Sequence, residues 1–158
     1  MSPVSLHLAL SGYRIVRWES NTLMRVYVEA LEAPRQCPSC GGDRLHSKGR
    51  YERRVRHLAC FGNPSELVIG CRRYVCLGCQ RSFVQPLPGI LPGRHSTEPW
   101  RQAIYERHGD GICASVLAER EEVAPGTVAR IYAQFTQRKA SERLSCQRPS
   151  ALDPLSPV

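Results

Sequence analysis

Two short cysteine pairs constrain this chain more than any other feature. The first is Cys37-Pro-Ser-Cys40 and the second is Cys76-Leu-Gly-Cys79, with 35 residues between Cys40 and Cys76. Two residues between cysteines let one tight turn direct both sulfur atoms to one point, and two such turns supply the tetrahedral set that Zn²⁺ prefers. The spacing predicts one structural Zn²⁺ bound by Cys37, Cys40, Cys76 and Cys79.

A disulfide framework is the alternative explanation of a chain with eight cysteines. Such frameworks belong to small secreted domains, whereas the first ten residues lack the basic and apolar regions of a signal peptide. We therefore expect a cytoplasmic, nucleoid-associated chain whose thiols stay reduced. A thioredoxin-like redox role is disfavoured, because it would use one of the two pairs and leave the other unexplained.

Residues close to the pairs carry secondary expectations. Gly41 and Gly78 are expected to supply the positive backbone angles of the two turns. His46 and His57 could replace a cysteine ligand, but solvated residues of a basic strand are the favoured interpretation. The four cysteines outside the pairs are Cys60, Cys71, Cys113 and Cys146. They need no function, and Cys113 is expected to be a small core residue.

Positive charge is concentrated between the cysteine pairs. The whole chain carries a formal charge of +8, and residues 41–83 hold nine Arg or Lys against three acidic residues. A concentrated basic patch favours a polyanion such as nucleic acid, with an ordinary soluble surface as the alternative. Arginine predominates here, and its guanidinium matches phosphate oxygens. The expected phosphate contacts are Arg50, Arg53, Arg54, Arg56, Arg72 and Arg73.

The first half of the chain has the alternating pattern of strands. We expect a β-hairpin within residues 1–36, from strands at 13–18 and 23–30, and a zinc ribbon over residues 37–84, with strands at 50–58 and 66–75. Phe61-Gly-Asn-Pro64 is the expected turn of the ribbon. The ribbon has few apolar residues, so the metal must supply much of its folding energy.

The second half changes to a helical period. Residues 85–95 are expected to be a Pro/Gly linker, residues 96–140 a three-helix helix-turn-helix domain, and residues 141–158 a disordered tail. The second helix should bury Val116 and Leu117, and the third, beginning at Pro125, should bury Val128, Ile131 and Phe135. An ordinary three-helix bundle is the alternative. The DNA-facing set expected on the third helix is Thr127, Arg130, Gln134, Gln137 and Arg138.

The order of these parts resembles the N-terminal region of the ISL-three family of bacterial insertion-sequence transposases, over roughly residues 6–140. The resemblance rests on the Cys-Pro-x-Cys-Gly pair, the arginine-rich strand, the Cys-Arg-Arg-Tyr-Val-Cys segment, the Leu-Pro-Gly segment and the helical end. It implies that the four cysteines bind zinc and that residues 123–135 form the turn and recognition helix. It also implies double-stranded DNA as partner, at the terminal inverted repeats of the element.

Members of that family continue into a ribonuclease H-like domain with three catalytic carboxylates. Here Asp153 stands near the expected place of the first, but its surroundings match poorly, and one carboxylate cannot hold the two metals of in-line phosphoryl transfer. We therefore expect an α+β, zinc-dependent DNA-binding protein that is not an enzyme and has neither a membrane nor a small-molecule partner. The alternatives are a stand-alone transcriptional regulator and an adaptor or inhibitor of full-length transposase; self-association is also open.

Overall fold

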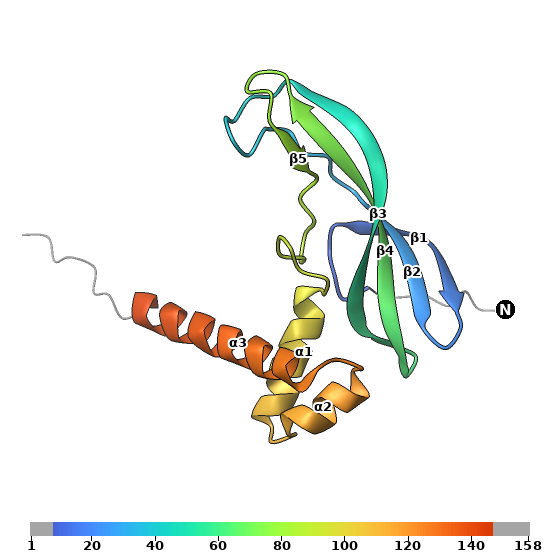
Figure 1. Ribbon diagram of the computed structural model, residues 1–158, viewed down its shortest axis with the longest axis vertical. Helices are drawn as coiled ribbons and strands as arrows, with labels where there is room; N and C mark the ends of the chain where they lie inside the picture. The colour runs from blue at the N-terminus through green and yellow to red at the C-terminus, as the bar shows by residue number, and fades with distance from the viewer. Residues whose placement is uncertain (1–7, 147–158) are drawn as a thin grey trace, which may run out of the picture. The chain divides into compact units, whose positions relative to one another are not determined.

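One sheet joins the N-terminal strands to the strands between the cysteine pairs (Figure 1). In the computed structural model, which describes residues 8–146, the fold is α+β with five strands and three helices. The strands are β1 (Tyr13–Ser20), β2 (Met24–Ala30), β3 (Leu45–Cys60), β4 (Asn63–Cys76) and β5 (Ser82–Val84). Their order is β1-β2-β4-β3, and β5 also pairs with β4. The described chain divides into two compact units between Ala103 and Ile104, not at residue 95.

The N-terminal strands are hydrogen-bonded into the ribbon and do not merely pack against it. β2 runs parallel to β4, with Met24 opposite Ser65 and Glu29 opposite Gly70. β5 then pairs antiparallel with the far end of β4, where Tyr74 is opposite Phe83. β4 therefore has β3 along one side and β2 followed by β5 along the other. This shared strand makes the expected hairpin and ribbon one sheet.

The β3–β4 hairpin is longer than the sequence pattern suggests, with 16 residues in β3 and 14 in β4. Phe61 and Gly62 form its turn, with φ of 50° and 79°. Positive φ at both central residues is typical of a type I′ turn, whose twist matches that of the flanking strands. In Figure 1 both strands continue past β1 and β2 toward β5, and β4 ends at Cys76, the first cysteine of the second pair.

The core of unit 1 lies on one face of the sheet, away from the cysteine pairs. Its buried members are Met24, Val26, Val28, Val55, Leu67, Ile69, Cys71, Leu87 and Ile90. The last two come from the segment expected to be a linker. That segment has no helix or strand, but the Tyr13 hydroxyl donates to the Pro88 carbonyl at 2.8 Å and Gln85 Nε2 donates to the Glu32 carbonyl at 3.0 Å. Residues 85–95 therefore belong to the core structure of unit 1 and do not separate two domains.

The start of α1 (Glu98–Gly109) is fastened to β3. The Arg56 amide donates to the His95 carbonyl, and the Thr97 amide donates to the Arg56 carbonyl, each at 2.9 Å. His57 is buried, and its Nδ1 lies 2.8 Å from the Thr97 hydroxyl oxygen. The expectation that His57 is solvated is wrong, because the N-terminus of α1 covers this part of β3.

Unit 2 contains the end of α1 together with α2 (Ala114–Arg120) and α3 (Pro125–Cys146). Leu117 is buried in α2, and α3 buries Val128, Ile131 and Phe135 as the helical period predicts. Val116 and Cys113, expected inside, are exposed. No helix among the described residues is long and apolar enough to cross a membrane.

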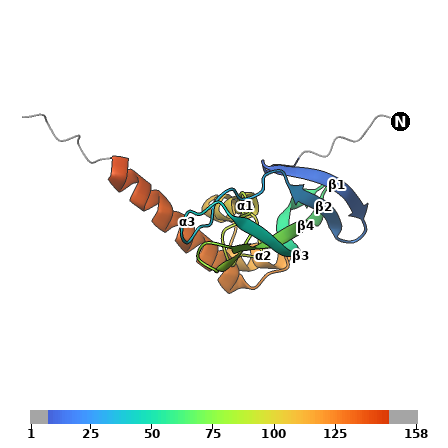
Figure 2. The same ribbon diagram turned by 90° about the horizontal axis from the view of Figure 1, so that it is seen from above.

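The third helix runs six residues past residue 140, the expected end of the helix-turn-helix domain, and its C-terminal half extends beyond α1 and α2 (Figures 1 and 2). Every residue from Thr136 to Cys146 is exposed. The remainder of the expected tail, with Asp153, lies outside the described residues.

Candidate metal centre and nucleic-acid interface

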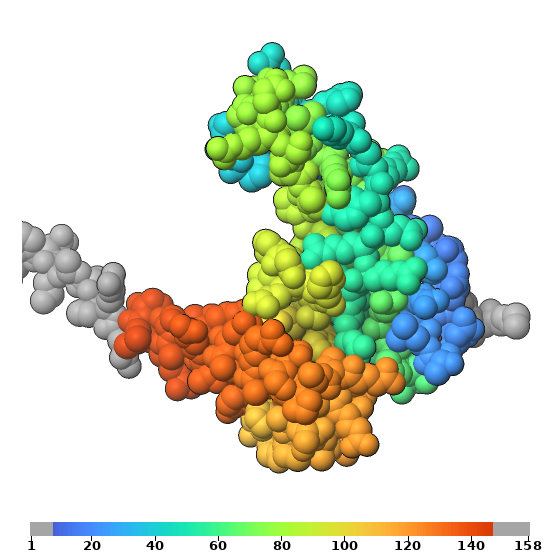
Figure 3. All heavy atoms as spheres, in the orientation of Figure 1, coloured from blue at the N-terminus to red at the C-terminus, as the bar shows by residue number. Residues whose placement is uncertain are grey.

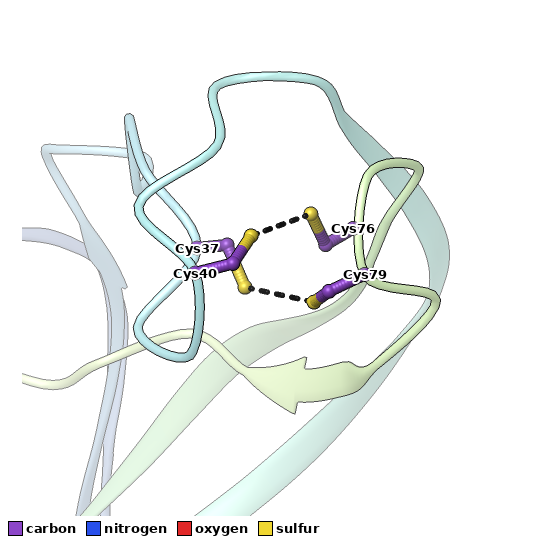
Figure 4. Close-up of side chains that lie close together, drawn as sticks. All are labelled: Cys37, Cys40, Cys76 and Cys79. Atoms are coloured by element: carbon purple, nitrogen blue, oxygen red, sulfur yellow. Dashed lines mark hydrogen bonds between the residues drawn. The ribbon is translucent and has the colours of Figure 1, made fainter.

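The two cysteine pairs lie in turns that repeat the same hydrogen bonds. In the first, the Gly41 amide donates to the Cys37 carbonyl at 2.8 Å, and in the second the Gln80 amide donates to the Cys76 carbonyl at 2.9 Å. The amide of each leading cysteine donates in turn to the carbonyl five residues later, at 2.8 and 2.9 Å. β3 and β5 both pair with β4 at this end of the sheet, so the strands hold the two turns face to face (Figure 4).

The four sulfur atoms fit a tetrahedral zinc ion. Cys37 Sγ lies 3.7 Å from Cys79 Sγ, Cys40 Sγ lies 3.6 Å from Cys76 Sγ, and all four lie within 4.8 Å of one another. Four sulfurs about 2.3 Å from a tetrahedral centre would be about 3.8 Å apart, whereas a disulfide needs about 2.05 Å. The predicted ligands are confirmed as a set, and they hold one structural zinc ion.

Backbone amides around the sulfurs favour the thiolate form that binds metal. The Ser39 amide points at Cys37 Sγ at 3.4 Å, and this hydrogen bond is the main cause that lowers the pKa of Cys37 to about 6. The amide of Cys79, followed by that of Gly78, lowers the pKa of Cys76 against the opposing effect of burial. At Cys40 the Gly42 amide acts in the same direction, but the neighbouring Cys76 and Cys79 side chains outweigh it and raise the pKa of Cys40 to about 11. Since zinc binds the thiolate, the backbone amides of the two turns favour metal binding.

One glycine expectation is right and the other is wrong. Gly41 has φ of 73°, but in the second turn the positive angle belongs to Gln80, at 61°, and not to Gly78. Gly78 instead lies beside a sulfur, since a Cβ built on it would be 3.6 Å from Cys76 Sγ. Gly41 and Gln80 each directly follow the second cysteine of their pair. This shared position is the sequence signal that would have identified Gln80.

Among the described residues, the four cysteines are the one group of three or more His, Cys, Asp or Glu side chains placed to share a metal ion. Neither His46, which is exposed, nor His57 belongs to it. Cys60, Cys71, Cys113 and Cys146 are free thiols outside this group. Residues 8–146 therefore supply one metal centre, at the end of the sheet opposite the β3–β4 turn.

The six arginines expected to bind phosphate divide between the two faces of the sheet. Side chains alternate along a strand, so Arg50, Arg54 and Arg56 of β3 share the outer face, and the pairing of Arg50 with Arg72 places Arg72 there too. Arg53 lies on the core face, where its Nη2 donates to the Arg94 carbonyl.

Two of the remaining arginines have intramolecular contacts. Arg73 also lies on the core face, with its guanidinium 5.4 Å from the centre of the Tyr51 ring. Arg56 is half-buried on the outer face, 6.0 Å from the Trp100 ring. Arg50, Arg54 and Arg72 remain as exposed arginines of the outer face.

The polar residues expected on α3 share one side of the helix. At about 100° per residue, Thr127, Arg130, Gln134, Gln137 and Arg138 fall within an arc of about 100°. Arg130 Nη2 donates to the Thr127 hydroxyl oxygen at 3.3 Å, and the Arg138 guanidinium lies 4.5 Å from the centre of the Phe135 ring. Arg130, Gln137 and Arg138 are exposed, so this side of α3 is a polar surface of unit 2.

Comparison with known proteins gives one match. Residues 33–79 match the family described as the zinc-finger of transposase IS204/IS1001/IS1096/IS1165. The match contains all four ligand cysteines and the strands between them. No curated protein and no solved structure matches the chain. Residues 33–79 thus form a zinc ribbon similar to that of ISL-three family transposases.

Proposed function

We propose that this chain is a zinc-dependent DNA-binding protein of the transposase type that recognises the terminal inverted repeats of an insertion sequence. The observation that carries the proposal is the four-sulfur centre inside the segment that is similar to a transposase zinc finger. The exposed arginines of β3 and β4, in the same ribbon, supply the positive charge that a phosphate backbone attracts. Binding of this kind would place the protein on the nucleoid.

The two units divide the work. Exposed arginines of the sheet bind the backbone, which provides affinity but little sequence information. In unit 2, α2, a four-residue turn and α3 act as a helix-turn-helix, and α3 lies in the major groove. Arg130 and Gln134 are one turn apart on the polar side of α3, and this spacing would let both contact base edges in one groove.

The proposed activity is binding without strand transfer. In-line phosphoryl transfer uses two metal ions held by several carboxylates. Within residues 8–146, the potential metal ligands gather in groups of three or more only at the four cysteines. The match of residues 33–79 to a transposase zinc finger supports the binding part of this proposal.

Selection from random double-stranded DNA tests the proposal. The purified zinc-loaded chain should enrich one motif, and that motif should match inverted repeats flanking the gene. Enrichment of a promoter sequence instead would favour a transcriptional regulator, and no DNA binding at low salt would favour an adaptor.

Substitutions on α3 test which residues read the sequence. A bidentate Arg–guanine contact is worth about 1–3 kcal/mol of discrimination, so Arg130→Ala should erode the preference for the enriched motif by at least several-fold. Arg143→Ala is the matched control, because Arg143 is an exposed arginine of the same helix on a different side. Equal loss in both variants, or a loss of preference in Arg54→Ala with none in Arg130→Ala, would contradict the proposed division.

A further inference from the structure

The outer face of the sheet has two halves with different charge. In the half formed by β1 and β2, each arginine is paired with a glutamate, which neutralises it. The pairs are Arg14–Glu29 at 2.7 Å, Arg17–Glu19, and Arg25–Glu66 at 3.5 Å. In the half formed by β3 and β4, the side chains of Arg50, Arg54 and Arg72 make no ion pair or hydrogen bond with any described residue. The unbalanced positive charge of this face therefore lies in the second half.

Arg50 and Arg72 are direct cross-strand partners. Side chains in such positions have Cβ atoms about 4.5–5.5 Å apart, and like charges there destabilise a sheet. Both side chains are exposed on the outer face, so neither is held away from the other by burial. Two guanidinium groups at this spacing can approach one anion together, and an anion between them would remove the repulsion.

A hollow beside the pair leaves room for such an anion. Its volume is about 690 Å³, and Arg50, Arg72, Gly70 and Gln85 contribute to its lining. It lies where β2 has ended and β5 has not yet begun along β4. Glycine at position 70 leaves β4 without a side chain opposite Glu52, which keeps the surface beside the arginines open.

We propose that Arg50 and Arg72 together clamp one phosphate group of the nucleic-acid backbone at this hollow. Arg54, on the same face and about 13 Å further along β3 at about 3.3 Å per residue, binds a separate phosphate. This rests on the proposed function in taking DNA as the source of the phosphate. The proposed clamp differs from a general basic surface because two arginines bind one phosphate, while Arg53 and Arg73 bind none.

Two carboxylates also line the hollow and limit how tightly it holds an anion. Glu29 is paired with Arg14, whereas Glu52 has no partner among the described residues. The Glu52 carboxylate would repel a phosphate held by its neighbours on the same face. Glu52→Gln should therefore strengthen DNA binding to all sequences alike, which a surface unrelated to DNA would not do.

The salt dependence of duplex binding by the zinc-loaded full chain tests the clamp. Each phosphate neutralised contributes about 0.9 to the slope of log affinity against log salt. The Arg50→Gln, Arg72→Gln double variant should lose about 0.9, and either single variant should lose less, because the other arginine still contacts the phosphate. Arg73→Gln is the matched control, since it removes the same charge at the next residue on the opposite face, and it should leave the slope unchanged.

A loss of about 1.8 in the double variant would mean two independent phosphates and would overturn the clamp, and so would no loss at all.

Titration of the ¹⁵N-labelled chain with inorganic phosphate, at ionic strength held constant with chloride, separates this inference from the proposed function. The Nε–H signals of Arg50 and Arg72 should shift together while that of Arg73 does not. Such shifts in a chain that binds no DNA would sustain the anion clamp and refute the DNA proposal. Absence of the shifts would overturn the clamp even if DNA binds through α3.

Discussion

Gly41 and Gln80 occupy the same position in the two cysteine turns, and both have positive φ, of 73° and 61°. The left-handed conformation costs a residue with a side chain about 1–2 kcal/mol, a cost that glycine avoids. Gln80 offsets part of it, because its Nε2 donates to the Leu77 carbonyl at 3.3 Å. Gln80→Gly should raise the free energy of unfolding of the zinc-loaded protein by about 0.5–1 kcal/mol. Urea denaturation of wild type and variant at saturating zinc measures this change in the free energy of unfolding.

The reciprocal substitution is the control. Gly41→Gln places a side chain at the equivalent angle and should lower the free energy of unfolding by about 1 kcal/mol. Effects of the same sign in the two variants would show that the turns are not equivalent.

Zinc stoichiometry follows from the four-sulfur geometry. The purified protein should contain one zinc ion per chain, and the Cys37→Ala, Cys76→Ala double variant should contain none, because it removes one ligand from each turn. Elemental analysis of protein prepared without chelator measures both. Cys60→Ser and Cys71→Ser should each keep one zinc, since these thiols lie outside the group. Zinc retained by the double variant would disprove the assignment.

Removal of the metal should unfold one end of the sheet and leave the other. None of the buried core residues of unit 1 lies in the cysteine turns or in β5. In the metal-free chain, amide hydrogen exchange should become fast in β5 and at residues 45–47 and 74–76, while Val26, Val55 and Leu67 stay protected. Loss of protection throughout β2 would instead support the sequence-based view that the metal folds the whole ribbon.

The zinc ligands and the buried side of α3 could be predicted because both depend on short-range patterns. Two residues between cysteines define a turn locally, and Val128, Ile131 and Phe135 repeat at the helical period. The parallel pairing of β2 with β4 was missed because it joins strands about 40 residues apart without a local turn signal.

The division of the arginines between faces was only partly available from the sequence. Alternation already requires Arg53 and Arg54 to point in opposite directions. Placing Arg72 and not Arg73 beside Arg50 needs the cross-strand register, and an irregularity between His57 and Cys60, next to the hairpin turn, shifts that register by one residue. Similarly, Pro and Gly at residues 86–93 correctly indicate irregular backbone but carry no information on burial.

The irregular segment after β5 should contribute to stability as a core element. Leu87 is 8% exposed and packs in the core cluster, so Leu87→Ala should lower the free energy of unfolding by about 2–3 kcal/mol. The control is Leu91→Ala, because Leu91 is in the same segment but 39% exposed and should cost less than about 1 kcal/mol. Chemical denaturation of both variants measures the difference, and equal small losses would mean that the segment is a linker after all.

His57 should make the stability of unit 1 depend on pH. The Thr97 hydroxyl oxygen accepts the Trp100 amide at 3.4 Å, so its proton is free to be donated to His57 Nδ1, which accepts only in the neutral ring. Burial lowers the pKa of His57 to about 4. An unfolded histidine titrates near about 6.5, so between these values the unfolded chain binds the proton and the folded chain does not.

The free energy of unfolding should therefore fall as the pH drops through this window, by up to about 3 kcal/mol from His57 alone. His57→Gln keeps a polar partner for Thr97 without a titrating group, so the difference in stability between wild type and variant should shrink as the pH drops from 7 toward 4. Urea denaturation of both proteins at each pH and equal total zinc measures this difference, since protonation of the cysteines affects both alike. His46→Gln, at the exposed histidine of the same strand, is the matched control for the substitution itself. Parallel profiles for wild type and His57→Gln would show that the pKa of His57 is the same in the folded and unfolded chains, and that its contact with Thr97 does not depend on the neutral ring inferred from the geometry.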